Sequence, residues 1–128
     1  MERLEKTYSI KTTAKALYDA LTNPAIVSQW SGAPAVMSEE LDFAFSLWGG
    51  SIIGLNNVVS PNKLVQQWKE KSWEEFSNVK FEWKEKSNRV ELILTHDNIP
   101  KESFENIKRG WDDHYMNPLI TWLESNNL

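Results

Sequence analysis

The sequence contains no cysteine among its 128 residues. Disulfide bonds, thiolate metal ligands and thiol nucleophiles are therefore excluded. Histidine is nearly as scarce, because only His96 and His114 are present. A metal site built from histidines needs two or three of them on converging elements. We therefore expect neither a metal site nor a bound cofactor.

The chain also lacks an excess of positive charge and a long apolar run. Its formal net charge is −4, so no basic field attracts the phosphate backbone of a nucleic acid, and nucleic acid is not an expected partner. No segment approaches the roughly 20 apolar residues of a membrane-spanning helix. The N-terminus, MERLEKTYSI, is charged and has no apolar region typical of a secretory signal. These features predict a cytoplasmic protein without a membrane span.

Tryptophan, by contrast, is abundant, with seven residues. Indole rings bury much apolar surface per residue, and they also line apolar pockets, so composition alone does not separate a core from a binding site. The length is that of one ordinary domain. No internal repeat, low-complexity tract or linker interrupts the chain. We predict a single domain over residues 1–128.

The N-terminal part predicts one strand and two short helices. Thr7 to Ile10 forms a short first strand. Thr13 caps a helix whose apolar residues recur at helical spacing. Asn23 caps a second helix that has Pro24 at its first position and runs to about Trp30.

The middle of the chain predicts five more strands. The stretch FAFSLWGG places Phe43, Phe45 and Leu47 on one strand face and Trp48 on the other. Paired glycines then favour a tight hairpin. Further strands are expected over 52–59, 64–69, 79–84 and 90–95, separated by polar turns. Strict alternation of apolar and charged residues in 79–84 indicates a sheet with one buried face, and a meander is the simplest topology.

The C-terminal part predicts one long helix over 101–123. Its apolar residues step by three or four and form one stripe. The stripe consists of Phe104, Ile107, Trp111, Tyr115, Leu119 and Trp122. Pro118 cannot donate a hydrogen bond to the carbonyl of His114, so a kink is expected there. A sheet covered by one long helix is an α+β arrangement.

Several stretches carry a resemblance to a known family. Tyr18 to Pro24, followed by Trp30, resembles the START-like, helix-grip (SRPBCC) superfamily. "FSLWGGSIIG" at 45–54, "PNKLVQQWKEKSW" at 61–73 and "FENIKRGWDDHYMNPL" at 104–119 resemble the activator of heat shock protein 90 ATPase homologue family. The resemblance covers nearly the whole chain and is of the type found as the C-terminal domain of eukaryotic co-chaperones.

This resemblance implies a fold and narrows the function. It implies a curved six-stranded antiparallel sheet, two short helices after the first strand, and a long C-terminal helix over the concave face. Members of the superfamily bind hydrophobic molecules between helix and sheet, and some catalyse reactions there. The co-chaperones also have a separate N-terminal domain and a leading Trp-rich motif. The chain is expected to begin directly at the helix-grip domain, which favours ligand binding over ATPase activation.

An apolar set of residues is the candidate binding site. Its members are expected to face the space between sheet and helix, where the hydroxyl of Tyr115 or the indole N–H of Trp111 would orient a ligand. The set comprises Phe43, Phe45, Trp68, Phe81, Trp83, Leu92, Leu94, Phe104, Trp111 and Tyr115. The alternative is that these side chains fill the interior to normal density.

Catalytic motifs are missing. No G-x-S-x-G, H-E-x-x-H or phosphate-loop spacing is present. His96 is interpreted as an exposed turn residue beside Asp97, and His114 as a polar residue on the helix flank.

Three functions remain open. The first hypothesis is non-catalytic binding of a small hydrophobic or aromatic molecule. The second is a protein-interaction module that modulates heat shock protein 90. The third is a cavity enzyme, such as a hydrolase or cyclase, that uses Tyr115 or His114 as acid or base. In each case the protein is expected to be a monomer or a homodimer.

Overall fold

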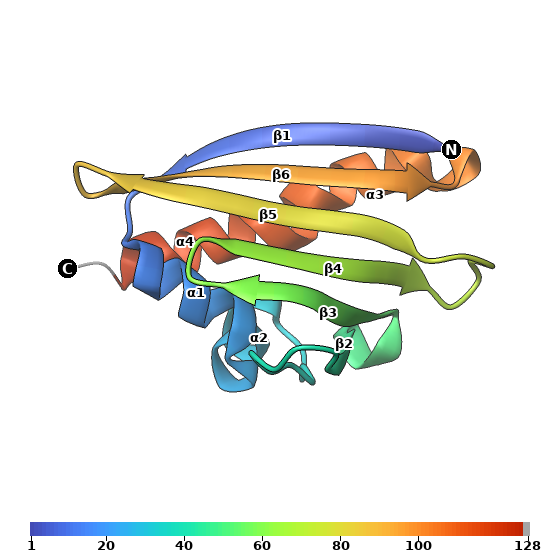
Figure 1. Ribbon diagram of the computed structural model, residues 1–128, viewed down its shortest axis with the longest axis horizontal. Coiled ribbons are helices and arrows are strands. Elements are labelled where there is room, and N and C mark those ends of the chain that lie inside the picture. Colours follow the sequence, from blue (N-terminus) through green and yellow to red (C-terminus); the bar gives the residue numbers. More distant parts are fainter. Residues whose placement is uncertain (127–128) are drawn as a thin grey trace.

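The computed structural model describes residues 1–126 of the chain. Six antiparallel strands form one sheet in the order β1-β6-β5-β4-β3-β2 (Figure 1). The strands are β1 (Glu2–Ile10), β2 (Ala44–Leu47), β3 (Ile52–Ser60), β4 (Lys63–Glu70), β5 (Ser77–Lys86) and β6 (Arg89–Ile99). Strands β2 to β6 follow each other as the predicted meander, and β1 pairs with β6 at the far edge.

Both short helices after the first strand are confirmed, with their caps. In α1 (Ala14–Thr22) the Thr13 side chain accepts a hydrogen bond from the amide of Ala16. In α2 (Pro24–Ser31) the Asn23 side chain accepts from two amides, and Pro24 occupies the start of the helix. These side chains use backbone donors that a helix N-terminus otherwise leaves unpaired.

The first strand is longer than predicted. It begins at Glu2 and not at Thr7, and it pairs with β6 almost along its length. Its outer side chains are charged or polar and reach water. Sequence alternation is weak in such an edge strand, because few of its side chains are buried.

The C-terminal helix is confirmed, but it is not a uniform α-helix. A 3₁₀ turn, η2 (Lys101–Ser103), leads into α3 (Phe104–Gly110); a π-helical segment, η3 (Trp111–Met116), then precedes α4 (Asn117–Ser125). The amide of Asn117 donates to the carbonyl of Asp112, five residues back. This wide turn occurs immediately before Pro118, where the kink was predicted, and it accommodates the missing amide donor.

The π-helical segment changes which residues face the sheet. A wide turn inserts one residue relative to α-helical spacing, so both Tyr115 and Met116 are buried. After it, Leu119 and Leu123 continue the buried stripe. Trp122, which the sequence placed at the end of this stripe, is half-buried and packs against the core cluster, and its Nε1 donates to Gln29 Oε1 at 3.1 Å.

The core lies between the helices and one face of the sheet. The C-terminal helix runs diagonally behind the strands, and α1 and α2 cover the end of the sheet near β3 and β4 (Figure 1). The buried apolar side chains form one cluster that includes the alternate residues of β5 and β6. The structure therefore has the α+β helix-grip fold that the sequence predicted.

Candidate functional site

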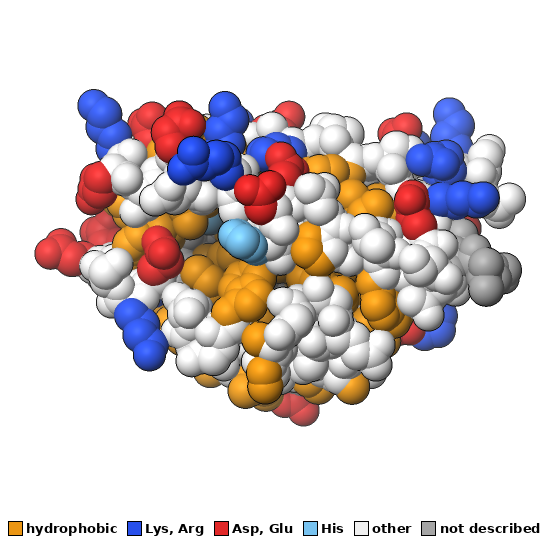
Figure 2. Space-filling model, turned by 180° about the vertical axis from the view of Figure 1, so that it is seen from behind, with side chains coloured by type: hydrophobic (Ala, Val, Ile, Leu, Met, Phe, Trp, Pro, Cys, Tyr) orange, Lys and Arg blue, Asp and Glu red, His pale blue; other side chains and the backbone are white. Residues whose placement is uncertain are grey.

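A pocket opens between the C-terminal helix and the end of the sheet formed by β3 and β4. Its volume is about 360 Å³, within the range of small-molecule sites. Figure 2 shows the helix side of the molecule, where apolar side chains are visible in a hollow near the middle. The pocket is lined by Trp48, Ser51, Ile52, Trp68, Glu70, Asn106, Ile107, Gly110, Trp111, His114 and Tyr115.

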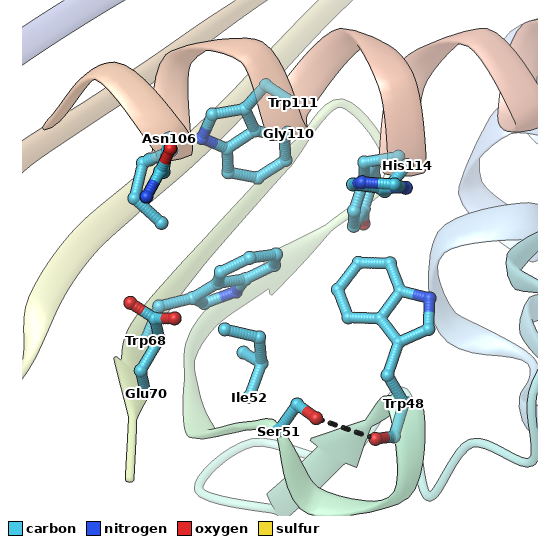
Figure 3. A pocket seen from close by; sticks show the side chains of 11 residues that line it. Trp48, Ser51, Ile52, Trp68, Glu70, Asn106, Gly110, Trp111 and His114 are labelled. Carbon is cyan, nitrogen blue, oxygen red and sulfur yellow. Dashed lines mark hydrogen bonds between the residues drawn. The ribbon is translucent and has the colours of Figure 1, made fainter. Parts of the chain in front are cut away.

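Aromatic rings form most of the wall of this pocket (Figure 3). Trp68 from β4 stacks on Trp111 from η3, with ring centroids 4.7 Å apart and planes 27° apart. Tyr115 lies 4.8 Å from Trp111 and 6.3 Å from Trp48, in tilted and edge-to-face geometry. Such pairs add to the stability that burial alone gives. The wall is therefore rigid and made largely of π surface.

The π-helical segment positions two of these rings together. Trp111 and Tyr115 belong to η3, and His114 between them reaches the rim of the same pocket (Figure 3). Single π-helical turns are rare and occur frequently at functional sites. Because this turn contributes Trp111, His114 and Tyr115 to the pocket wall, we take the pocket as the candidate site.

A buried histidine holds Trp111 in place. Nε1 of Trp111 donates to Nδ1 of His96 at 2.9 Å, and Nε2 of His96 lies 2.7 Å from Oγ of Ser77. An indole N–H can only donate, so Nδ1 must be the unprotonated nitrogen and Nε2 must carry the proton. Ser77 Oγ in turn donates to the carbonyl of Trp68 at 2.7 Å. Each side-chain nitrogen and oxygen of Trp111, His96 and Ser77 therefore has a hydrogen-bond partner.

The prediction that His96 is an exposed turn residue is wrong. The strand was expected to end at residue 95, but β6 continues to Ile99 and His96 is fully buried. His96 has the same parity as Val90, Leu92 and Leu94, which all face the core. If the alternation of buried residues in this strand is continued from Leu94 to residue 96, it predicts that His96 faces the core. Burial lowers the pKa of His96 to about 4, opposed by the nearby Asp97 carboxylate.

A second buried polar chain fixes Trp68. Its Nε1 donates to Oε1 of Gln66 at 2.8 Å, and Nε2 of Gln66 donates to Oδ1 of Asn56 at 2.9 Å. Asn56 then donates to the carbonyls of Ser38 and Glu40. The loop before β2 is thus tied through two strands to the pocket wall. Fully paired networks of this kind rigidify a core.

The predicted site residues divide into two groups. Trp68, Trp111 and Tyr115 line the pocket. The other seven do not: Phe45, Phe81, Trp83, Leu92 and Leu94 are buried in the core, and Phe43 and Phe104 are half-buried. Phe81 supports the wall from behind, since its ring stacks on Tyr115 at 5.7 Å. The indole N–H of Trp83 has no partner among the described residues.

Trp48 belongs to the wall, although the sequence placed it on the outer strand face. The hairpin after β2 is not formed by the two glycines alone: η1 (Trp48–Gly50) is a 3₁₀ turn in which Trp48 has φ 50° and Gly49 has φ 66°. Positive φ is uncommon for a bulky residue. It turns the indole back toward the helices, where Nε1 donates to the carbonyl of Ser31 at 3.2 Å. Strand periodicity ends at Leu47 and could not predict this direction.

The pocket offers little acid–base chemistry. His114 is exposed at the rim, as predicted for a helix-flank residue. Burial raises the pKa of Tyr115 far above its usual range, and its hydroxyl has no hydrogen-bond partner among the described residues. A phenol that is both neutral and unpaired makes a poor base at neutral pH. Within residues 1–126, no group of three or more acidic or histidine side chains is arranged to hold a metal ion.

An ion pair joins η3 to the first strand. Asp112 accepts hydrogen bonds of 2.6 Å from both Nζ of Lys6 and the hydroxyl of Tyr8. Burial alone would raise the pKa of Asp112, but these two donors outweigh it and lower the pKa below its usual range. Asp112 is adjacent to Trp111 in η3, so this contact holds the helix against β1 on the side opposite the pocket.

The fold and the pocket together define a helix-grip protein with an aromatic cavity under its C-terminal helix. The family described as Activator of Hsp90 ATPase homolog 1-like protein matches residues 11–124. The chain belongs to this family. Among the described residues, no helix has both the length and the apolar character needed to cross a membrane.

Three similar proteins illustrate the relationship. An HSP90 activator from Plasmodium falciparum has a solved structure that is 29% identical, with a TM-score of 0.88 and 96% of each chain covered. Activator of 90 kDa heat shock protein ATPase homolog 1 from Homo sapiens is 26% identical over 82% of this chain and 32% of its own length. The Aha1 dimer from Colwellia psychrerythraea shares the fold at 17% identity, with a TM-score of 0.80 and 97% of each chain covered. The chain spans about a third of the length of the curated relatives it matches.

Proposed function

We propose that this protein acts as a co-chaperone-like module that binds heat shock protein 90 and modulates its ATPase activity. The observation that supports this most directly is the match to the Plasmodium falciparum HSP90 activator, which covers 96% of both chains. The sequence ranked this function second, because the longer co-chaperones carry a further domain. Because the Plasmodium falciparum activator matches this chain over 96% of both chains, we now rank modulation of heat shock protein 90 first. Correspondence to the C-terminal domain of longer relatives stays a prediction.

The proposed action is regulatory and not catalytic. It agrees with the family description, which names an activator of the Hsp90 ATPase. We retain the cytoplasmic location expected from the sequence as part of this proposal. A monomer or a homodimer is compatible with it.

An ATPase assay with the heat shock protein 90 of the source organism tests the proposal. The full chain is added in increasing excess, and hydrolysis that persists with a specific heat shock protein 90 inhibitor is subtracted. We expect a saturable change in turnover, together with co-sedimentation of the two proteins. A folded protein of similar size and net charge serves as the control. No change in turnover at saturating excess would reject the proposal.

The pocket supports a second candidate function, binding of a small hydrophobic or aromatic molecule. The specific observation is a cavity of about 360 Å³ walled by three indoles and a phenol. Pockets of this size and lining bury most of a small ligand. This was the leading hypothesis from the sequence, and it is compatible with a regulatory role in which the ligand and the chaperone bind the same chain.

A variant that fills the pocket tests this second function. Gly110 lies on the wall, and a side chain there meets nothing closer than His114 Cδ2, 3.9 Å from the added Cβ. We expect Gly110→Leu to abolish saturable binding of a neutral naphthylamine dye, while Gly110→Ala retains it. Equal dye binding by both variants, or none by the unmodified protein, would reject the pocket as the site.

A further inference from the structure

The polar edges of the pocket's indole rings are all turned away from the cavity. The N–H of Trp48 donates to the carbonyl of Ser31, that of Trp68 to Gln66, and that of Trp111 to His96. An indole presents a positive edge at its N–H and a negative π face. With each N–H engaged elsewhere, the rings contribute apolar and π surface to the cavity and no donor for an anionic or carbonyl ligand.

The formal charge on the lining is negative. Glu70 follows Gln66 and Trp68 on the same face of β4 and lies at the edge of the pocket (Figure 3). Its carboxylate has no hydrogen bond or ion pair within residues 1–126. The adjacent Lys69 has the opposite parity in the strand, and its Nζ lies 5.6 Å over the ring of Phe76. No lysine or arginine lines the pocket.

A further unused group lies on the wall. The hydroxyl of Tyr115 has no partner among the described residues, although the residue is only 3% exposed. Its oxygen is not among the fully buried side-chain atoms without a partner, so this oxygen is accessible on the pocket wall. It offers an oxygen acceptor in addition to the ring faces.

We propose that this pocket binds an organic cation of the alkylated ammonium class, with its methyl groups against the faces of the tryptophans and its charge balanced by Glu70. Aromatic faces attract such cations more strongly than neutral groups of the same shape when the site is desolvated. A lipid phosphate beside the ammonium is disfavoured, because it would approach an unpaired carboxylate. The proposal rests on the pocket's function as a small-molecule site. The cation is either a free metabolite or a methylated lysine side chain of a partner protein.

Calorimetric titration of the full chain with a matched pair of probes tests this inference. Choline and 3,3-dimethyl-1-butanol have nearly the same shape and differ in charge. We expect choline to bind about tenfold more tightly or better. Its affinity is expected to fall with added salt, whereas that of the neutral alcohol stays constant.

Two variants separate charge from shape. Glu70→Gln is expected to weaken choline binding by roughly threefold or more and to leave the alcohol unchanged. Glu91→Gln removes the same charge from an exposed position outside the pocket and is expected to change neither affinity. Trp48→Leu keeps an apolar wall without its π face. It is expected to weaken choline binding more than alcohol binding and so to reduce the preference for choline, with circular dichroism confirming an intact fold.

The results of these titrations distinguish the source of the cation, and they separate failure of the cation proposal from failure of the pocket function. Tighter binding of a peptide containing trimethyllysine than of choline assigns the cation to a partner protein, and the reverse assigns it to a free metabolite. If the alcohol binds as tightly as choline, the cation proposal fails while the pocket remains a binding site. If neither probe binds up to tens of millimolar, both the cation proposal and the pocket function fail.

Discussion

At the scale of single residues, His96 shows how polar groups shape the pocket from behind. Both ring nitrogens are used, one as acceptor for Trp111 and one as donor to Ser77. A proton added to Nδ1 would face the N–H of Trp111 and break the bond that orients that ring. The neutral tautomer therefore supports the pocket wall from behind, although His96 itself does not reach the cavity.

Acidification is expected to destabilise the protein through this residue. The pKa of His96 is lowered to about 4 in the folded chain and returns to about 6.5 on unfolding. The unfolded chain therefore binds more protons between these values, so stability is complete above pH 6.5 and falls as pH drops toward 4. The loss amounts to about 3 kcal/mol. Urea unfolding monitored by circular dichroism across this range measures it.

Two histidine variants provide the control for this pH dependence. His96→Gln is expected to remove most of the slope between pH 6.5 and 4, whatever its effect on stability at neutral pH. His114→Gln changes an exposed residue and is expected to keep the slope. A slope that persists in His96→Gln would show that other groups cause it.

Gly54 is required because its neighbours leave no room for a side chain. A Cβ there would lie 1.9 Å from the carbonyl oxygen of Gln67 and 2.6 Å from Cζ of Phe45. We expect Gly54→Ala to lower the free energy of unfolding by roughly 2–3 kcal/mol or more, since backbone and a buried ring must move. Chemical denaturation measures the change.

Gly110→Ala is the matched comparison for Gly54→Ala. It introduces the same methyl group where the nearest atom is 3.9 Å away. In a helical position it is expected to raise the free energy of unfolding by about 0.5–1 kcal/mol. Equal effects of the two substitutions would contradict the steric argument.

At the scale of elements, the π-helical segment η3 determines where the pocket is. It places Trp111 and Tyr115 on the pocket wall and Asp112 against the first strand. The sequence predicted a kink here from Pro118 and an apolar stripe from helical spacing. It could not predict the extra residue in the turn, because the wide turn depends on how η3 packs against β1 and β4.

The contact between η3 and β1 is expected to contribute measurably to stability. Asp112→Ala leaves the ammonium of Lys6 and the hydroxyl of Tyr8 without their acceptor, and only 19% of the Lys6 side chain is exposed. The expected loss is about 1–2 kcal/mol in urea unfolding. Asp113→Ala, at an exposed neighbouring position, is expected to stay within about 0.5 kcal/mol of the unmodified protein. Similar losses for both would argue against a specific contact.

At the scale of the whole molecule, periodicity was sufficient for the fold. Alternation placed five strands, and capping residues placed α1 and α2, because these signals depend on local contacts. The position and lining of the pocket could not be predicted from local sequence patterns. Its wall depends on a positive φ at Trp48, on the π-helical turn η3, and on side-chain hydrogen bonds between separate elements, such as Trp111 to His96 and Gln66 to Asn56.

We propose that the chain unfolds as one unit, as expected for the single domain predicted over residues 1–128. The supporting observation is one cluster of buried apolar residues shared by sheet and helices. Calorimetry is expected to give one transition whose calorimetric and van't Hoff enthalpies agree. Circular dichroism and tryptophan fluorescence are expected to report the same midpoint. Two separated midpoints would reject cooperative unfolding.

The face-to-face contact of Trp68 and Trp111 also has a spectroscopic consequence. Two indoles held 4.7 Å apart, with planes 27° apart, are close enough for their electronic excitations to couple, and we expect this coupling to contribute to the ultraviolet circular dichroism spectrum. The circular dichroism signal of this tryptophan pair is therefore expected to depend on how closely the C-terminal helix packs on the sheet. A change that separates the C-terminal helix from the sheet is expected to alter this signal before secondary structure is lost.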